Sequence, residues 1–158
     1  MDQPRIERAL KRLSIQIWER LNPEQEIVLI GLNERGYATA TQISAYLAAH
    51  LGEEKPVQQF NVFGDSPMVK IPDCNDKAVF LIDDVIFSGK TMFRALSAIC
   101  SAYEPLAIDI VTLLDRGHRR YPLLSELTGM SVPTKTGEHI EVMLKEGKLH
   151  QAVLFKNN

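Results

Sequence analysis

Two kinds of hydrophobic pattern alternate along the chain. Apolar side chains recur every three or four positions over 5–21, which predicts a helix, at Ile6, Leu10, Leu13, Ile17 and Leu21. A second helical pattern covers 37–51. Mostly apolar runs at 26–32, 78–82 and 105–114 are typical of strands buried on both faces of a parallel sheet. This alternation predicts an α/β fold, a doubly wound and mainly parallel sheet flanked by helices.

Weaker patterns lie between these elements. Residues 57–63 alternate imperfectly and predict a strand near a sheet edge. A turn at 64–67 then predicts a short returning strand at 68–71. We interpret 121–130 as a mobile or short helical segment.

The last part of the chain predicts a β-hairpin. Residues 139–144 alternate in polarity, Glu146 and Gly147 supply a turn, and 152–155 can pair back. We expect this hairpin at the sheet edge. The chain has 158 residues, 45% hydrophobic and 24% charged, with no internal repeat, so we expect 1–158 to form a single domain.

Charge and cysteine content exclude several classes of protein. A net charge of −2 gives no global attraction to nucleic acid or to an anionic membrane. The two cysteines, Cys74 and Cys100, have no metal-binding spacing, and we place Cys100 on a buried helix face. They indicate reduced thiols rather than a disulfide framework. The start of the chain has no apolar targeting segment and no run reaches membrane-spanning length, so a cytoplasmic location is expected.

The most informative stretch follows the apolar run at 78–82. Asp83 and Asp84 come at the end of this predicted strand, a loop covers 85–88, and Gly89 leads into an amphipathic helix. Ligands of open α/β sheets bind at the carboxyl ends of strands, where helix N-termini favour anions. Adjacent carboxylates can accept hydrogen bonds from sugar hydroxyls. The order predicts a site for a phosphorylated sugar, whereas the simpler alternative is an acid pair that only solvates a strand end.

Two further loops are expected at the same edge. The predicted strand at 26–32 leads into a glycine loop at 31–36, where Arg35 is placed to meet an anion. The predicted strand at 105–114 ends in the polar run Asp115-Arg-Gly-His-Arg-Arg120. Because parallel strands present their carboxyl ends together, these loops should join the acid pair in one site.

These residues carry a family resemblance. The run Val79-Phe-Leu-Ile-Asp-Asp-Val-Ile-Phe-Ser-Gly-Lys-Thr91 resembles the phosphoribosyl pyrophosphate (PRPP) motif of type I phosphoribosyltransferases. The segment Leu113–Arg119, with Val132-Pro-Thr134 after it, resembles more narrowly the PyrR type. In that group a uracil phosphoribosyltransferase fold doubles as an RNA-binding regulator of pyrimidine genes.

The resemblance implies a pentosyltransferase that forms UMP from uracil and PRPP, with magnesium bound on the pyrophosphate and no metal ligand assigned to the protein. By this resemblance Asp83 and Asp84 hold the ribose hydroxyls and the cationic sugar ring. The 5′-phosphate is held by Ser88, Gly89, Lys90 and Thr91, and Val85 is a further ligand-binding residue. The pyrophosphate is bound by Arg35 with Gly36, and the base by Arg116 with Gly117. A homodimer is expected, because dimers are common in the family.

Three departures from the family pattern leave a second interpretation open. Asn33 and Glu34 stand where the PyrR type has lysine and threonine, and four residues at 64–67 replace a longer loop that closes over the site. Basic positions tied to RNA in that type are matched at Arg12 and Arg119 but replaced elsewhere, at Leu124 and Met130. The alternative is a catalytically weak nucleotide- or PRPP-binding regulator of pyrimidine metabolism. RNA binding is the less favoured partner prediction.

Overall fold

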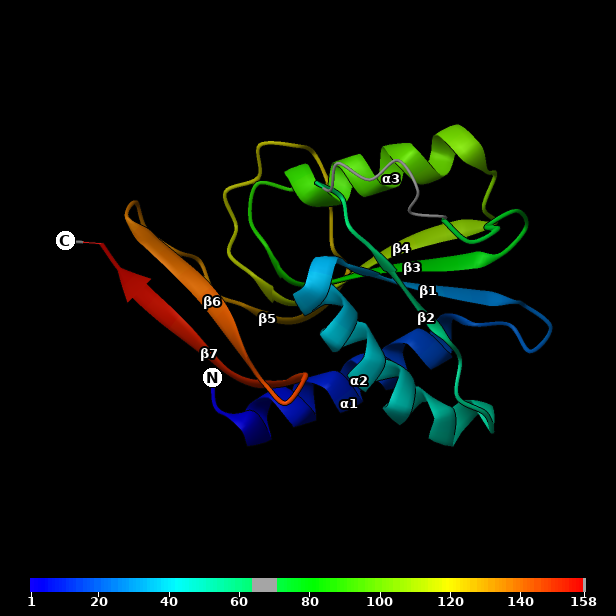
Figure 1. Ribbon diagram of the computed structural model, residues 1–158, viewed down its shortest axis with the longest axis horizontal. Coiled ribbons are helices and arrows are strands. Elements are labelled where there is room, and N and C mark those ends of the chain that lie inside the picture. The colour runs from blue at the N-terminus through cyan, green and yellow to red at the C-terminus, as the bar shows by residue number, and fades with distance from the viewer. Residues whose placement is uncertain (64–70, 158) are drawn as a thin grey trace.

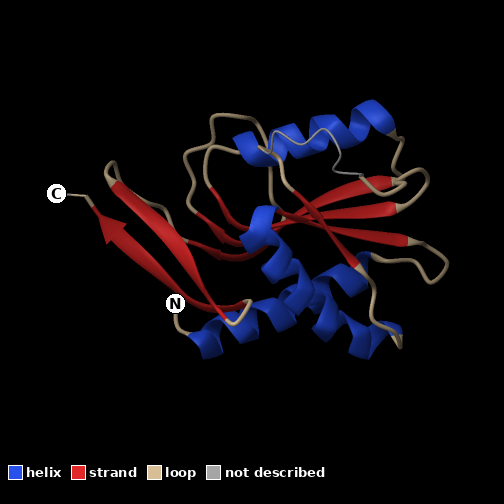
Figure 2. Ribbon diagram, viewed as in Figure 1, coloured by secondary structure: helices blue, strands red, loops and turns tan. Residues whose placement is uncertain are grey.

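The computed structural model describes residues 1–63 and 71–157, arranged in three layers with a hairpin beside them (Figures 1 and 2). In chain order the elements are α1 (Gln3–Arg20), β1 (Ile27–Leu32), α2 (Asn33–Leu51), β2 (Val57–Phe60), β3 (Ala78–Ile86), α3 (Lys90–Ala102), β4 (Ala107–Asp115), β5 (Leu127–Ser131), β6 (Glu138–Lys145) and β7 (Lys148–Lys156). The first five strands form one sheet in the order β2-β1-β3-β4-β5, with all neighbours parallel. α1 and α2 cover one face and α3 covers the other (Figure 1). The predicted α/β class is confirmed.

The central strand β3 is buried on both faces, as its apolar run predicts. Alternate side chains of a strand point to opposite faces. Ala78, Phe80 and Ile82 belong to the core that includes α1 and α2. Val79 and Leu81 belong to the second core, beneath α3. This double burial fixes the strand in the middle of the sheet.

The predicted glycine loop at 31–36 is wrong in its extent. Gly31 lies within β1, and α2 begins at Asn33, so Arg35 and Gly36 belong to the first turn of α2. Asn33 has a φ of 57°, a conformation that asparagine adopts more readily than most residues. The chain therefore turns from strand to helix without a longer loop.

Two other boundaries differ from prediction. β3 continues to Ile86, because its pairing with β4 extends to Ile86↔Asp115. The loop predicted at 85–88 therefore begins only after Ile86. The segment 121–130 enters β5, which pairs with β4 from Val111↔Leu127 onward, and is not helical. A β-carbon on Gly129 would lie 2.5 Å from the Leu113 carbonyl oxygen, so this strand approaches β4 at a glycine.

The C-terminal hairpin is confirmed, but its predicted place at the sheet edge is wrong. β6 and β7 pair antiparallel in a sheet of their own, while β5 occupies that edge of the main sheet. The hairpin buries Val142, Leu149 and Ala152 in the same core as α1 and α2. Apolar burial against the helices therefore decides where the hairpin lies.

The remaining predictions have mixed outcomes. β2 lies at the sheet edge, as predicted. Cys74 is buried, but Cys100 is exposed rather than on the buried face of α3. The predicted turn at 64–67 and most of the returning strand at 68–71 lie outside the described residues. Among the helices described, none has the length and apolar character needed to span a membrane.

Candidate functional site

Polar side chains from separate elements meet at the carboxyl edge of the sheet. β1, β3 and β4 are parallel neighbours, so their C-terminal ends lie side by side. A pocket of about 370 Å³ lies there, lined by the first turn of α2, the end of β3, Arg116 after β4, and β6. A smaller pocket of about 220 Å³ shares Asp83, Val85 and Phe87 with it. The two pockets therefore form one continuous site.

The acid pair lies between β4 and the start of α2. Asp83 pairs in register with Thr112 of β4, and the Asp84 N–H donates to Asp83 Oδ1 at 2.9 Å. Burial, and then the negative charge of Asp84, raise the pKa of Asp83 well above its ordinary value. On the α2 side, a β-carbon on Gly36 would lie 3.2 Å from Asp83 Oδ1 and 2.7 Å from the Ile82 carbonyl oxygen. Only a glycine therefore lets α2 approach the acid pair this closely.

The smaller pocket is formed by the loop that enters α3. Gly89 precedes the helix with a φ of 86°, and Ser88 Oγ accepts a hydrogen bond from the Lys90 N–H at 3.3 Å. Within the described chain, no side chain caps the amides of Thr91 and Met92. Uncapped amides at a helix N-terminus bind anions well. The Lys90 side chain is exposed. The donors available to an anion in this pocket are therefore the backbone amides and the hydroxyl groups of Ser88 and Thr91.

Arg35 connects the larger pocket to the hairpin. It lies in the first turn of α2 and lines the pocket, and its Nε donates to the Val142 carbonyl of β6 at 2.8 Å. Glu34 lines the same pocket. The predicted anion ligand therefore has a carboxylate beside it.

Arg116 forms another wall of the larger pocket. Its guanidinium carbon lies 4.1 Å from the centroid of the Phe87 ring, and its Nη2 donates to the Glu138 carbonyl at 2.6 Å. Its Nε donates to Thr134 Oγ1 at 3.3 Å. Burial lowers the pKa of Arg116, but a guanidinium remains charged in proteins. The flat faces of Arg116 and Phe87 suit a planar ring.

The residues after Arg116 hold the loop rather than line the pocket. The Gly117 N–H donates to Asp115 Oδ1 at 2.9 Å, and the His118 Nε2–H donates to the Thr134 carbonyl. Arg119 makes a bidentate ion pair with Asp115, at 2.7 and 2.9 Å. Partial burial acts to raise the pKa of Asp115, but hydrogen bonds from Arg119 and from the Gly117 amide lower it overall. Gly117, predicted to contact the base, is not among the residues that line either pocket.

Comparison with known proteins shows the family of the chain. The family model of the phosphoribosyl transferase domain matches residues 1–145. The bifunctional protein PyrR of Thermoanaerobacter sp. (strain X514) is 35% identical over 168 residues, covering 98% of this chain and 94% of the relative. The PyrR of Chloroflexus aurantiacus is 36% identical over 154 residues, covering 89% and 85%. The chain belongs to the PyrR type of the phosphoribosyltransferase family.

Solved structures show the same fold. A hypoxanthine-guanine phosphoribosyltransferase of Leishmania tarentolae, in complex with GMP, superposes with a TM-score of 0.72 at 16% identity, covering 89% of this chain and 82% of the other. A hypoxanthine-guanine phosphoribosyltransferase (hpt-2) of Bacillus anthracis gives 0.69 at 22% identity, covering 89% and 85%. At these identities the likeness concerns the fold alone.

In this PyrR-type phosphoribosyltransferase the two arginines that the resemblance associates with RNA, Arg12 and Arg119, are engaged within the chain. Arg12 donates to two carbonyl groups of β5. Arg119 is held by its ion pair and by the Phe87 carbonyl at 2.9 Å. Leu124 and Met130 are solvent-facing, with 73% and 39% of their surface exposed. The surface therefore presents apolar groups at these two positions.

Sequence reasoning missed part of the pocket of this phosphoribosyltransferase. Phe87 falls in the predicted loop at 85–88 and has no predicted role, although it lines the pocket and an aromatic residue there is a usable signal. The hairpin supplies Ile140, Glu141 and Val142, which no local pattern assigns to the site. Only the folded position of β6 reveals them.

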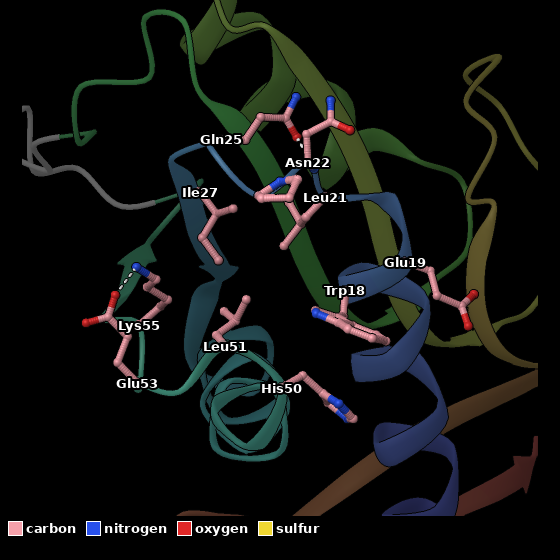
Figure 3. A pocket seen from close by; sticks show the side chains of 11 residues that line it. Trp18, Glu19, Leu21, Asn22, Gln25, Ile27, His50, Leu51, Glu53 and Lys55 are labelled. Atoms are coloured by element: carbon pink, nitrogen blue, oxygen red, sulfur yellow. Dashed lines mark hydrogen bonds and ion pairs between the residues drawn. The ribbon is translucent and has the colours of Figure 1, made fainter.

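A further pocket, larger than either of the two above, contains none of the predicted site residues. It measures about 660 Å³ and lies between the C-terminal turns of α1 and α2 and the start of β1 (Figure 3). Trp18 and His50 stack at one side of it, with ring centroids 5.1 Å apart. Glu53 and Lys55 form an ion pair of 2.5 Å on the other side. We call it the aromatic pocket.

Proposed function

We propose that the chain transfers the ribose 5-phosphate group of PRPP to uracil and forms UMP and pyrophosphate. The observation that carries this proposal is the order of groups across the two adjoining pockets. An anion cradle at the start of α3 lies next to the acid pair of β3, and Arg35 and Arg116 lie beyond it. A phosphate, a ribose, a pyrophosphate and a base can occupy that order of groups. Likeness to the PyrR type favours uracil as the base.

Asp83 and Asp84 act on the sugar. In the transfer, the bond from the anomeric carbon to pyrophosphate breaks and a bond to the N1 atom of uracil forms, while the N1 proton leaves to solvent. Positive charge develops on the sugar ring between these events. Carboxylates that accept from the ribose hydroxyls hold the ring in place and stabilise this charge.

The two ends of PRPP meet different donors. The 5′-phosphate lies on the amides and hydroxyls of Ser88 to Thr91, where the N-terminus of α3 favours negative charge. The pyrophosphate lies near Arg35, and Gly36 lets its helix approach the acid pair. The base lies against Phe87 and Arg116, bounded by Ile140 of the hairpin.

Magnesium fits this pocket as a partner of pyrophosphate. The larger pocket is lined by four acidic residues, Glu34, Asp83, Asp84 and Glu141, and by two arginines. Among the described residues, no three acidic, histidine or cysteine side chains converge as a metal site. Magnesium usually takes one or two carboxylates together with substrate phosphates, and it would neutralise the leaving pyrophosphate. Glu34 and the acid pair are the candidate protein ligands.

A second candidate function is a weakly catalytic sensor of PRPP or nucleotides that regulates pyrimidine metabolism. The observation that favours it is Glu34, whose carboxylate lines the pocket expected to hold pyrophosphate. A like charge there weakens binding of the leaving group unless a cation lies between them.

RNA binding is a third candidate function. It is disfavoured because Arg12 and Arg119 are bound within the chain. We also expect a homodimer, which light scattering can test.

The deciding experiment combines a uracil and Mg-PRPP assay for UMP with calorimetry of PRPP binding in the same sample. UMP formation would establish the transfer reaction. PRPP binding without UMP would favour the sensor or a different base, and orotate and hypoxanthine would then be tested. Absence of PRPP binding would overturn both candidate functions. A titration with pyrimidine leader RNA at low salt would decide the third, because phosphate contacts are strongest there.

A further inference from the structure

The C-terminal hairpin is held over the site by two arginines. Arg35 donates from Nε to the Val142 carbonyl at 2.8 Å, and Arg116 donates from Nη2 to the Glu138 carbonyl at 2.6 Å. These carbonyls are four residues apart on β6, so they point to the same side of the strand. Ile140 lies midway between them and lines the larger pocket. The position of this pocket wall therefore depends on residues from two distant parts of the chain.

The two arginines use their donors differently. Arg116 is occupied on three sides, by Glu138, by Thr134 Oγ1 at 3.3 Å, and by the Phe87 ring. Arg35 uses only Nε. Its Nη1 and Nη2 donate to no other group in the part of the chain that the structure describes, although the side chain lines the pocket. Arg35 can therefore bind the hairpin with one edge and an anion with another.

We propose that Arg35 is a positioning residue that couples occupation of the pyrophosphate end of the pocket to the placement of the β6–β7 hairpin. A guanidinium is planar and rigid, so an anion that fixes Nη1 and Nη2 also fixes the direction of the Nε–H bond. The Val142 carbonyl in turn orients the guanidinium toward the anion. Thermodynamic linkage makes this coupling reciprocal. The inference rests on the proposed function, because it places a pyrophosphate group in this pocket.

The strand β6 connects the Arg35 contact to the base side of the site. Val142 is buried in the core and lines the pocket together with Ile140 and Glu141, which immediately precede it. A shift of β6 at Val142 therefore moves the wall against which the base is expected to lie. No side chain or motif of β6 would reveal this link from the sequence, because the contact is to a backbone carbonyl.

Amide hydrogen exchange of residues 138–156 tests the proposal, with and without Mg-pyrophosphate, and with Mg-PRPP as a second probe. In the wild-type protein, either ligand should slow exchange across the hairpin. Arg35→Ala should speed exchange in the ligand-free protein by roughly two- to tenfold, as expected for one lost hydrogen bond. It should also remove the response to ligand.

Two variants separate coupling from simple loosening of the hairpin. Arg35→Lys keeps the charge but lacks the planar fork, so it should still bind Mg-pyrophosphate, with affinity lowered by up to about tenfold, and show no response in the hairpin. Arg116→Lys should loosen the hairpin yet retain the response to ligand, because Arg35 remains. Arg20→Ala, which removes a surface ion pair with Asp109 and Glu126, should change neither quantity.

The outcomes are distinguishable. Ligand binding by the wild-type protein with unchanged hairpin exchange overturns the coupling and leaves the proposed function standing. A full hairpin response in Arg35→Lys also overturns it, because charge alone would then suffice. Failure of the wild-type protein to bind either ligand overturns the proposed function and the coupling together. Loss of the response in Arg35→Lys, with its retention in Arg116→Lys, supports the assignment.

Discussion

Two hollows of this molecule lie at opposite ends of β1 and α2 and differ in chemistry. The aromatic pocket, near Ile27 and Leu51, is the larger at about 660 Å³ and is enclosed by the C-terminal turns of two helices. The site at the other end, near Leu32 and Arg35, measures about 370 Å³ and holds charged side chains. In a parallel sheet, strand carboxyl ends and helix N-termini converge on one edge, so polar loops and free amides gather there. Position in the sheet, rather than size, favours the second pocket as the candidate site.

The largest effect that tests this comparison should follow loss of the acid pair. Replacing Asp83 and Asp84 together by asparagine removes both charge-assisted acceptors for the ribose hydroxyls, each contributing about 1.5–3 kcal/mol. We expect PRPP affinity to fall at least about a hundredfold, measured by calorimetry, and UMP formation to fall further. The matched change Glu19→Gln in the aromatic pocket should leave both unchanged. Equal affinity in the double variant and the wild-type protein would contradict the ribose assignment.

A smaller effect should follow a β-carbon at the start of α2. In Gly36→Ala that atom would lie 2.7 Å from the Ile82 carbonyl oxygen, so α2 or β3 must shift. Overpacking of this kind typically costs about 1–3 kcal/mol of unfolding free energy, measured by urea denaturation. PRPP affinity should fall as well, because Asp83 lies within the shifted region.

A glycine near the aromatic pocket gives the control. Gly52 has a φ of 80° and open space around it, so Gly52→Ala should cost about 1–2 kcal/mol of stability through backbone strain alone. PRPP affinity should stay at the wild-type value. If both variants weakened PRPP binding equally, the effect at Gly36 would reflect general instability rather than its place beside Asp83.

Stability should also depend on pH through Asp83. Its pKa is raised in the folded protein, so between about pH 4, where an unfolded aspartate titrates, and the raised value, the folded state holds a proton that the unfolded state has lost. Stability should therefore fall as pH rises through this window, by up to about 1.4 kcal/mol for each pH unit. Asp83→Asn should remove the slope and stabilise the protein at neutral pH. Asp84→Asn should reduce the slope without abolishing it, since burial is the larger cause.

The smallest effect should come from the aromatic pocket itself. Trp18 is the only tryptophan and stacks on His50, a contact of about 0.5–1.5 kcal/mol. Trp18→Ala should lower stability by about this amount and leave PRPP affinity and UMP formation unchanged. In the wild-type protein, Mg-PRPP should leave the Trp18 fluorescence unaltered. A ligand-dependent change in that emission would show that the two pockets communicate along β1 and α2.

Local sequence predicted the elements that carry the candidate site. The run of residues 78–91 contains β3, the acid pair and the start of α3, and the structure confirms the strand and the helix. The roles of these residues toward a ligand stay a prediction. Prediction failed where pairing with a distant strand decides the outcome. Pairing with β4 extends β3 to Ile86. Pairing with β4 also makes Leu127–Ser131 a strand, although these residues have no strong local pattern.

The sequence by itself determined the α/β class, the central strand and the family, because burial patterns and a contiguous ligand motif are written in local order. Tertiary structure alone decided that the hairpin forms a sheet of its own and that β6 lines the larger pocket. The apolar residues of the hairpin pack on the core that includes α1 and α2, and contacts between residues more than a hundred positions apart, such as that of Arg35 with the Val142 carbonyl, hold it there. A carbonyl acceptor is common to every residue type, so no reading of side chains could have identified it.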